Sequence, residues 1–513
     1  MTRAAADVGA GLAPARPARP IIAGERIHVV GIAGAGASAA AILAAAVGGQ
    51  VDGCDPGAPS PYSAALAAHD IEVATRHDAG HLTDGTGRRV DRLAVTKALT
   101  AIAPDHPELV AARSAGIPLE PWQQLVADAA ATNGQALIAV AGTHGKSTST
   151  GWLLHVLAAA GRDPSGFVGA LLPGTDSEAP STARIGRGDL CVVEADEYAG
   201  NFDAYRPALA VLLNAEWDHP DVFVDDAAVL DAFEGWIRAM PDQADRPTLV
   251  VNVGDPGAAA IAARLDDWPG RIVRVALEPD ATTDALDVTG RWTAAPGVGG
   301  GRLELGGTLT GPLSVDVTLD GRHNAADGLC VAAAAALLGL EGSAITGGLA
   351  GFPGVGRRLE QKGEPGGVLV YDDYGHHPAA IRSTMAAVRA RHPGRPLWAV
   401  YEPLTFHRTA AMLDAFAEVL ATADRAVIAD IWAGRDTDRT VTSAEALASA
   451  ISARAASPAL APGSVEQTAD TLATLVQPGD VVLVMGGGRS YVIAERLVER
   501  LATDGTGRTA IAG

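Results

Sequence analysis

Short apolar runs alternate with longer helical stretches along most of the chain, and this alternation constrains the fold more than any other feature. Runs such as 27–30, 136–141 and 397–401 each lead into a turn and then into a stretch of helical composition. Strands that alternate with helices in this way form a mainly parallel sheet with helices on both faces. The sequence therefore predicts an α/β protein, and its 513 residues are enough for about three domains.

Turn-rich breaks divide the chain into three α/β units. We predict domains at 26–134, 135–350 and 351–513, with a glycine-rich, hairpin-forming edge at 297–311 in the second. Residues 1–25 hold prolines and arginines among alanines and glycines and lack the apolar segment of a secretory signal. We predict that they form a disordered leader.

Composition excludes several classes of function. The chain carries 39 basic and 60 acidic residues, for a net charge of −21, which would repel nucleic-acid backbones and anionic lipids. No apolar stretch is long enough for a transmembrane helix. Three cysteines are too few and too scattered for a disulfide framework or a zinc cluster, which fits a reducing cytoplasm.

A glycine loop in the second unit carries one of only three lysines, the others being Lys97 and Lys362. The loop Gly142-Thr143-His144-Gly145-Lys146-Ser147-Thr148 lies between an apolar strand and a long helix. In such a loop backbone N–H groups can hold phosphates, the lysine can reach the β- and γ-phosphate oxygens, and a hydroxyl can bind Mg²⁺. The spacing is one glycine short of the general pattern, and the alternative is an ordinary strand–helix turn.

A second glycine loop, with Gly31, Gly34 and Gly36, follows the first strand of the chain and precedes a helix. Asp55 lies at the end of the next strand, where a carboxylate can meet a ribose hydroxyl. This context favours binding of a nucleotide diphosphate over a plain tight turn. It does not distinguish NAD from another diphosphate.

Two acidic segments follow strands of the second unit. They are Glu194-Ala195-Asp196-Glu197 and Asn214-Ala215-Glu216-Trp217-Asp218-His219. Because carboxyl ends of parallel strands meet at one edge of the sheet, Glu194 and His219 could complete a Mg²⁺ site beside the phosphate loop. Helix capping is the alternative role for such acids.

The third unit adds further polar groups near its first strand. Arg357-Arg358-Leu359-Glu360 follows a glycine- and proline-rich joint and could bring a cation to a nucleotide. Asp372-Asp373-Tyr374-Gly375-His376-His377-Pro378 follows a strand and opens a helix. A carboxylate here could hold a ribose and the histidines could orient a second substrate, although adjacent histidines are more often surface or cap residues.

Taken in order, these motifs resemble those of the Mur ligase family of peptidoglycan synthesis. The matching segments, which span about residues 25–500, are G-I-x-G-x-G at 31–36, A-G-T-H-G-K-S-T at 141–148, E-A-D-E at 194–197, N-x-x-x-D-H at 214–219, G-x-H-N at 321–324, F-x-G-V-x-R-R-x-E at 352–360, D-D-Y-G-H-H-P at 372–378 and the pair Arg408-Thr409. The resemblance implies a Rossmann-like N-terminal domain that binds the UDP-sugar, a central P-loop-type ATPase domain and a Rossmann-like C-terminal domain for the amino acid.

The resemblance also implies a reaction: ATP phosphorylates the carboxylate of UDP-N-acetylmuramate, and the amino group of L-alanine attacks the acyl phosphate. Its expected partners are these small molecules, and a cytoplasmic monomer or homodimer is expected. Carried over by position, the catalytic residues are Lys146, His219, Arg358, His376 and His377. ATP would contact the loop 142–148 with Asn324, Arg358 and Asp373, Mg²⁺ would bind Ser147, Glu194 and His219, and the UDP-sugar would contact Gly31, Gly34, Gly36 and Asp55.

Two segments depart from the family pattern. Leu404 stands after Pro403 where a histidine is often found, and Tyr198-Ala199-Gly200-Asn201-Phe202 replaces the usual acidic–serine continuation of E-A-D-E. These departures leave the amino acceptor open between L-alanine and the tripeptide used by recycling ligases. A non-catalytic nucleotide-binding protein and an NAD-dependent dehydrogenase are the alternatives from other classes.

Overall fold

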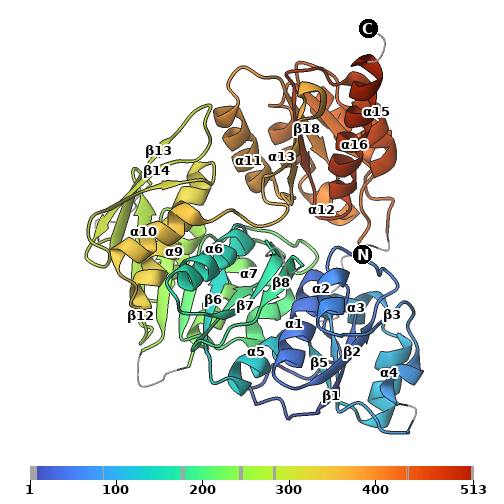
Figure 1. The fold of residues 1–513 in the computed structure, drawn as a ribbon, viewed down its shortest axis with the longest axis vertical. Coiled ribbons are helices and arrows are strands. Elements are labelled where there is room, and N and C mark those ends of the chain that lie inside the picture. The colour runs from blue at the N-terminus through green and yellow to red at the C-terminus, as the bar shows by residue number, and fades with distance from the viewer. Residues whose placement is uncertain are drawn as a thin grey trace. The chain divides into compact units, whose positions relative to one another are not determined.

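The computed structural model describes residues 8–84, 86–174, 179–241, 246–280, 285–434, 436 and 438–509, with side chains through 503. Three sheets, flanked by helices, follow one another along the chain (Figure 1). This confirms the predicted α/β fold of three domains. By its internal packing the chain divides into two units, one with the first two sheets and one with the third.

The first sheet is entirely parallel, in the order β3-β2-β1-β4-β5. Its strands are β1 (Arg26–Val30), β2 (Gln50–Cys54), β3 (Val73–Ala74), β4 (Arg92–Val95) and β5 (Leu119–Pro121). Its helices are α1 (Ala35–Ala46), α2 (Ser63–Ala68), η2 (Ala79–Leu82), α3 (Lys97–Ile102), α4 (Pro107–Ala115) and α5 (Gln123–Thr132). Strand order reverses between β1 and β4, and in open sheets of this kind ligands bind at the carboxyl ends of the strands beside such a reversal.

Residues 8–25 are packed against this domain, which corrects the prediction of a disordered leader for that part of the chain. Arg16 forms ion pairs of 2.8 Å with Glu120 and 2.7 Å with Asp128. Asp128 also pairs at 2.5 Å with the buried Arg92. The arginines that suggested a solvated leader instead neutralise buried carboxylates. Residues 1–7 lie outside the described part of the chain.

The central sheet has ten strands in the order β15-β14-β13-β12-β11-β10-β6-β9-β7-β8. Strands β7, β9, β6, β10, β11, β12 and β13 pair in parallel, and β8 is antiparallel to β7. The strands are β6 (Ala136–Ala141), β7 (Ser165–Leu172), β8 (Ser181–Arg184), β9 (Leu190–Ala195), β10 (Leu209–Leu212), β11 (Thr248–Asn252), β12 (Arg271–Leu277), β13 (Val288–Ala294), β14 (Gly301–Gly307) and β15 (Leu313–Val317). The helices are α6 (Lys146–Ala159), η3 (Tyr198–Ala204), α7 (Asp226–Arg238), α8 (Pro256–Arg264), α9 (Arg322–Leu337) and α10 (Gly342–Gly351).

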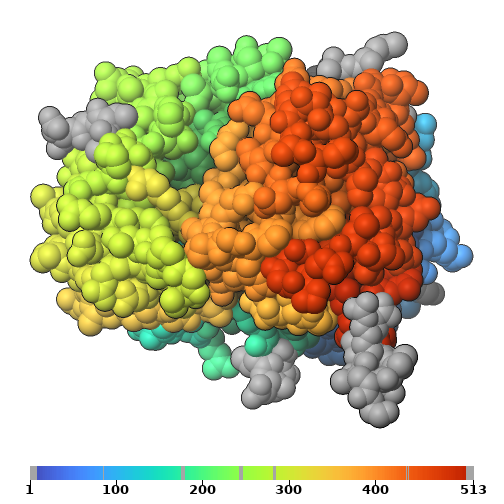
Figure 2. Space-filling model, turned by 90° about the horizontal axis from the view of Figure 1, so that it is seen from above, coloured from blue at the N-terminus to red at the C-terminus, as the bar shows by residue number. Residues whose placement is uncertain are grey.

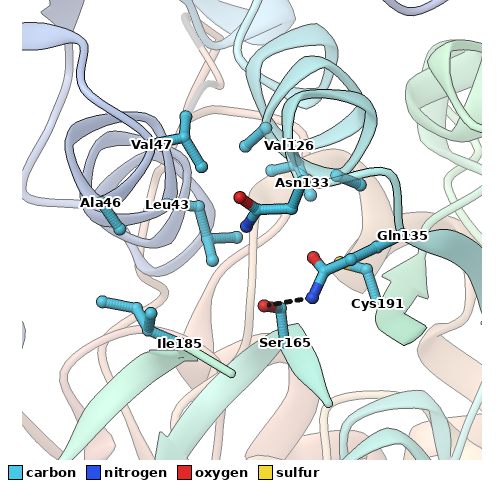
Figure 3. A pocket seen from close by; sticks show the side chains of 11 residues that line it. Leu43, Ala46, Val47, Val126, Asn133, Gln135, Ser165, Ile185 and Cys191 are labelled. Carbon is cyan, nitrogen blue, oxygen red and sulfur yellow. Dashed lines mark hydrogen bonds between the residues drawn. The ribbon is translucent and has the colours of Figure 1, made fainter. Parts of the chain in front are cut away.

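The first domain packs against the β7–β8 end of the central sheet, where α1 and α5 lie beside it (Figure 1). Trp122 meets Phe167 edge to face at 5.2 Å between ring centroids. A small pocket in this seam is lined mainly by aliphatic side chains, and Gln135 donates a 3.0 Å hydrogen bond to Ser165 at one side (Figure 3). Its lining includes none of the phosphate-loop residues, so we attribute it to imperfect packing of the seam.

The third sheet follows the order β16-β17-β21-β18-β19-β20, with only β16 antiparallel. Its strands are β16 (Glu360–Gly363), β17 (Leu369–Asp373), β18 (Leu397–Tyr401), β19 (Arg425–Ala429), β20 (Leu460–Gly463) and β21 (Val481–Met485). Its helices are η4 (Pro365–Gly367), α11 (Pro378–Arg391), α12 (Phe406–Ala411), α13 (Leu413–Leu420), α14 (Ala444–Ser452), α15 (Val465–Leu475) and α16 (Ser490–Thr509). Side chains of this domain form one continuous surface, orange to red in Figure 2.

The apolar runs 27–30, 136–141 and 397–401 named from the sequence coincide within one residue with the observed β1, β6 and β18. The glycine-rich section 297–311 contains β14 within the edge β13–β14–β15. Among the described residues, no helix combines the length and the apolarity needed to cross a bilayer.

Candidate active site

The phosphate loop joins β6 to α6 at the carboxyl edge of the central sheet. Gly145 is the N-cap of α6 at φ 79°, and a Cβ there would lie 2.4 Å from Asp327 Oδ2. Gly142 has φ 146°, and a Cβ would approach Asn214 to 3.2 Å. Both glycines are required by the backbone geometry and by the closeness of these neighbours.

The segment after β10 supports the loop from one side. Asn214 accepts a 2.8 Å hydrogen bond from the N–H of His144 and donates one of 3.0 Å to its carbonyl. The Thr143 hydroxyl accepts a 2.8 Å bond from the N–H of Glu216. His144 Nε2 lies 3.4 Å from the Glu216 carboxylate. These contacts fix the conformation of the loop, and β6 and α6 fix the positions of its two ends.

Lys146 lies in the first turn of α6 among acidic groups. Its Nζ is 2.9 Å from Glu197, 3.5 Å from Asp196 and 3.3 Å from the carbonyl of Thr143. Burial lowers the pKa of this ammonium, but the negative charges of Glu197, Asp196 and Glu194 outweigh it and raise the pKa above its ordinary value. The side chain therefore stays cationic at any physiological pH, as binding of phosphate oxygens requires.

The acidic groups nearest to Lys146 also meet His219. Its Nε2 lies 3.7 Å from both Glu197 and Asp218, and donor atoms of Asp196, Glu197 and His219 all lie within 4.8 Å of one another. Burial raises the pKa of Glu197 to about 7 despite Lys146. Burial acts in the same direction on Asp196, but Lys146 and His219 lower its pKa overall. We call Lys146, Asp196, Glu197 and His219 the central cluster.

Two of the predicted metal ligands have different surroundings. Glu194, at the end of β9, accepts a 2.6 Å hydrogen bond from the N–H of Gly169, although its charge acts on Lys146. Ser147 is buried in the first turn of α6. From the motif E-A-D-E we selected Glu194 and did not select Asp196 or Glu197, although the same motif contains both.

Asp327 is a further acid that sequence reasoning missed. It lies on α9 next to Gly145 and is 5% exposed, and burial raises its pKa to about 7. Asn324, the predicted ATP contact, is three residues earlier on the same helix and so lies on the same side of it. The sequence feature that could have pointed to Asp327 is a carboxylate within an alanine-rich helix.

In the first domain, the glycine loop surrounds the N-terminus of α1. Gly31 has φ 78°, and Gly34 is the N-cap of the helix. Asp55 accepts a 3.1 Å hydrogen bond from the N–H of Ala33. Gly36 has a packing role, since a Cβ there would lie 2.2 Å from the ring of Trp122. The predicted residues thus gather at the carboxyl ends of β1 and β2.

In the C-terminal domain, the two arginines differ in their contacts. Arg357 pairs at 3.1 Å with Asp372 and donates to the Gly486 carbonyl and the Ser490 hydroxyl, so it is a structural cation. The guanidinium of Arg358 lies 4.9 Å from the centre of the Tyr374 ring.

Asp373 and the histidines also take part in local structure. Asp373 accepts 2.8 Å hydrogen bonds from the N–H groups of Leu359 and Gly375. His376 Nδ1 lies 3.0 Å from the Tyr374 carbonyl, and His377 caps α11 by accepting from the N–H of Ala379 at 3.3 Å. The capping role anticipated for adjacent histidines is therefore present at His377.

Family profiles match three consecutive parts of the chain. Residues 26–133 match "Mur ligase family, catalytic domain", residues 140–336 match the "Mur ligase middle domain", and residues 357–488 match "Mur ligase, glutamate ligase domain".

Relatives and solved structures agree over nearly the full length. A UDP-N-acetylmuramate–L-alanine ligase of Frankia casuarinae is 35% identical over 94% of this chain and 99% of its own. The crystal structure of the UDP-N-acetylmuramate-alanine ligase MurC from Thermotoga maritima matches with TM-score 0.75 at 22% identity, covering 93% of this chain and 99% of that one. A murein peptide ligase from Psychrobacter arcticus matches with TM-score 0.68 at 23% identity over the same shares. The chain therefore belongs to the Mur ligase family.

Proposed function

We propose that this protein is an ATP-dependent ligase that joins L-alanine to the carboxylate of UDP-N-acetylmuramate through an acyl phosphate, a step of peptidoglycan precursor synthesis. The observation that carries the proposal is the 35% identity to a ligase of that name over nearly the whole of both chains. The central cluster supports it, because a lysine fixed in its charged form at a phosphate loop suits phosphoryl transfer.

Phosphate binding would fall to the loop Gly142-Thr143-His144-Gly145-Lys146-Ser147-Thr148. The N-terminus of α6 presents N–H groups to an anion, and the cationic Lys146 would stabilise charge on the transferred phosphoryl group. Asn324 would contact ATP from α9. Neutralisation of the phosphate charge allows the anionic carboxylate to attack the γ-phosphoryl group, with ADP as the leaving group. The acyl phosphate formed is the electrophile that the amino group then attacks, releasing phosphate.

Mg²⁺ would bind beside this loop. Asp196 and Glu197 offer oxygen donors and His219 a nitrogen donor, all within 4.8 Å of one another, and such a set fits a hard divalent cation with one imidazole ligand. Ser147 and Glu194 remain proposed ligands. When bound, the ion would supply charge neutralisation at the phosphate oxygens.

The two other domains would supply the remaining contacts. We propose 26–134 as the UDP-sugar domain, with Gly31, Gly34 and Asp55 at the nucleotide and Gly36 shaping the turn. We propose 135–350 as the ATP domain and 351–513 as the amino-acid domain. In the latter Arg358 and Asp373 would serve ATP, and His376 and His377 the amino acid. We expect a cytoplasmic enzyme, monomeric or homodimeric, acting on small molecules.

Addition of a tripeptide instead of L-alanine is the second candidate. The structural match to a murein peptide ligase supports this candidate, as does the sequence E-A-D-E-Y at Glu194–Tyr198, which resembles that of recycling ligases. The purified protein should release phosphate from ATP with UDP-N-acetylmuramate and L-alanine, and should form an alanine-bearing product by mass spectrometry. Product formed only with L-alanyl-γ-D-glutamyl-diaminopimelate would replace the first function with the second. No product with either acceptor would contradict both.

A further inference from the structure

A second polar cluster lies inside the first domain, away from the glycine loops. His28 of β1, Cys54 of β2, His81 of η2 and Glu108 of α4 each offer a donor atom within 4.8 Å of the others. We call these four residues the first-domain cluster. Two more histidines, His77 and His106, adjoin it. Four of the chain's 13 histidines and one of its three cysteines thus converge on one carboxylate.

The donor atoms face one another at short range. Cys54 Sγ lies 3.0 Å from Glu108 Oε1 and 3.4 Å from His28 Nε2. His81 Nδ1 lies 2.7 Å from Glu108 Oε1, and His28 Nε2 lies 3.5 Å from the same oxygen. In a tetrahedral zinc site, with Zn–N of about 2.0 Å and Zn–S of about 2.3 Å, donors are roughly 3.3–3.7 Å apart. An outward movement of a few tenths of an ångström would open these contacts to that spacing.

His28 is oriented as a metal ligand requires. Its Nδ1 lies 2.5 Å from the carboxylate of Asp52, on the neighbouring strand. A carboxylate accepts hydrogen bonds, so Nδ1 carries the proton that faces Asp52, and loss of the Nε2 proton on metal binding would present the Nε2 lone pair to an ion between Cys54 and Glu108. A carboxylate behind a histidine in this way is the common arrangement at zinc sites, where it fixes the ring and raises its basicity.

Three of the four residues are buried, His81 is 20% exposed, and the cluster with the adjoining His106 contains polar atoms without a hydrogen-bond partner. Glu108 and Cys54 are fully buried and His28 is 2% exposed. Both ring nitrogens of His106, which is 5% exposed, lack a hydrogen-bond partner, and so does Glu108 Oε2, 3.3 Å from His106 Nδ1. Buried polar atoms without a partner are rare and costly, and a cation bound through Glu108 Oε2 would give that oxygen a partner.

We propose that the first-domain cluster binds one Zn²⁺ ion through His28 Nε2, Cys54 Sγ, His81 Nδ1 and a Glu108 oxygen. Thiolate, imidazole and carboxylate together select zinc over Mg²⁺ or Ca²⁺, which prefer all-oxygen sites. As the Zn–S bond forms, the thiol proton of Cys54 passes to solvent. Four protein ligands in a closed site make it structural and not catalytic.

A bound ion would stabilise the end of β2, next to the glycine loop proposed to bind the nucleotide. The Cys54 carbonyl accepts a 2.8 Å hydrogen bond from the N–H of Gly31, and Asp55 is the next residue along the chain. Fixing the Cys54 side chain would therefore fix the end of β2, against which the glycine turn is built.

The test uses the full chain, stripped with a chelator, dialysed and titrated with ZnCl₂ or CoCl₂ alone. We expect one tightly bound zinc per chain and, with cobalt, a thiolate-to-metal charge-transfer absorption. Cys54→Ser should abolish that absorption, and Cys330→Ser, which changes a buried cysteine in α9, should keep it. The absorption also separates this site from the central cluster, whose four residues include no cysteine.

Asp52→Asn is the second variant, chosen because its carboxylate is 46% exposed and its loss should not prevent folding. We expect it to bind zinc about 10- to 100-fold more weakly. The absence of the cobalt–thiolate band in the wild type, or its persistence in a folded Cys54→Ser variant, would overturn the proposal and leave the cluster as a network of hydrogen bonds. An unchanged zinc affinity in Asp52→Asn would overturn the orienting role of Asp52.

Discussion

The central cluster and the first-domain cluster combine similar residue types but treat their carboxylates in opposite ways. Burial raises the pKa of Glu197 to about 7, because Lys146 only partly compensates and Asp196 adds a like charge. Burial acts in the same direction on Glu108, yet hydrogen bonds from His28, Cys54 and His81 lower its pKa to about 2. Glu197 has too few hydrogen-bond donors to offset its burial, whereas Glu108 has several.

The most exposed member of each cluster differs in the same sense. Asp196 is 37% exposed in the central cluster and His81 is 20% exposed in the first-domain cluster, while Glu197, His28 and Glu108 are 1%, 2% and 0% exposed. An open cluster with incompletely compensated charge can bind an exchangeable ligand, and a closed cluster serves the fold. The comparison therefore predicts that changes in the central cluster affect turnover and that changes in the first-domain cluster affect stability.

The largest expected effect is the loss of turnover in Lys146→Met. The variant keeps the length of the side chain but removes the ammonium charge that lies 2.9 Å from Glu197. We expect ATP-dependent phosphate release to fall by about 10³-fold, the upper range for one transition-state donor. Coupled measurement of ADP formation would determine it.

Lys362→Met is the matched control, because Lys362 forms partly exposed ion pairs in the C-terminal domain. Its turnover should stay within about twofold of the wild type. Both variants should melt as cooperatively as the wild type by circular dichroism. Turnover of folded Lys146→Met at the wild-type rate would remove the central cluster from the chemistry.

Glu108→Gln should destabilise the fold by about 3 kcal/mol in metal-free protein, since it removes the charged acceptor shared by buried donors. Chemical denaturation with a probe in the first domain would show it. Glu304→Gln, at a carboxylate 53% exposed, is the control and should change stability by less than about 0.5 kcal/mol. An equal, small effect of both variants would contradict the assignment of the first-domain cluster to the fold.

The central cluster could be predicted from the sequence because its residues lie in compact motifs. The strand, the loop and Lys146 are contiguous, and the parallel sheet brings the ends of β9 and β10 to the same edge. What the sequence could not decide was which acid of E-A-D-E turns toward Lys146. That choice depends on the backbone after β9, where Ala199 and Gly200 both have positive φ.

The first-domain cluster was beyond the same reasoning. Its histidines at positions 28 and 81, and the adjoining histidines at 77 and 106, share no spacing pattern. The register of β1 with β2 and the packing of η2 and α4 bring them together. Counting cysteines alone excluded a zinc cluster, whereas the structure supplies imidazole and carboxylate donors around one cysteine. The packing of residues 8–25 could not be predicted either, because it depends on buried acids that are distant in sequence.

Asp327→Asn tests whether a second carboxylate beside the phosphate loop has, like Glu197, a pKa that burial raises. Its folded pKa of about 7 lies above the ordinary 3.8, so the associated stability is fully present below pH 3.8 and is lost as pH rises through 7. Wild-type protein should therefore be less stable at pH 8 than at pH 5 by an amount that the variant lacks, on the order of 2–3 kcal/mol. Parallel unfolding curves at the two pH values would measure it. The same pH difference in both proteins would show that Asp327 ionises normally.

The smallest expected effect concerns the link between the two domains that hold the clusters. Lys97, at the start of α3, donates to the carbonyls of Ala199 at 2.9 Å and Gly200 at 2.6 Å, in the segment that departs from the family pattern directly after Glu197. Burial lowers its pKa, with Asp203 and Asp196 opposing.

Lys97→Met leaves two carbonyls without this donor but also removes a partly buried charge, so we expect a net loss of only about 1 kcal/mol. Because the segment continues from Asp196 and Glu197, we expect kcat to fall by about fivefold, which corresponds to about 1 kcal/mol of activation free energy. Steady-state kinetics would distinguish a fall in kcat from a change in KM for the UDP-sugar. Lys97→Arg should restore part of kcat, because it keeps a hydrogen-bond donor at this position. A change confined to KM would place Lys97 with the first domain's ligand and would remove the link between the two regions.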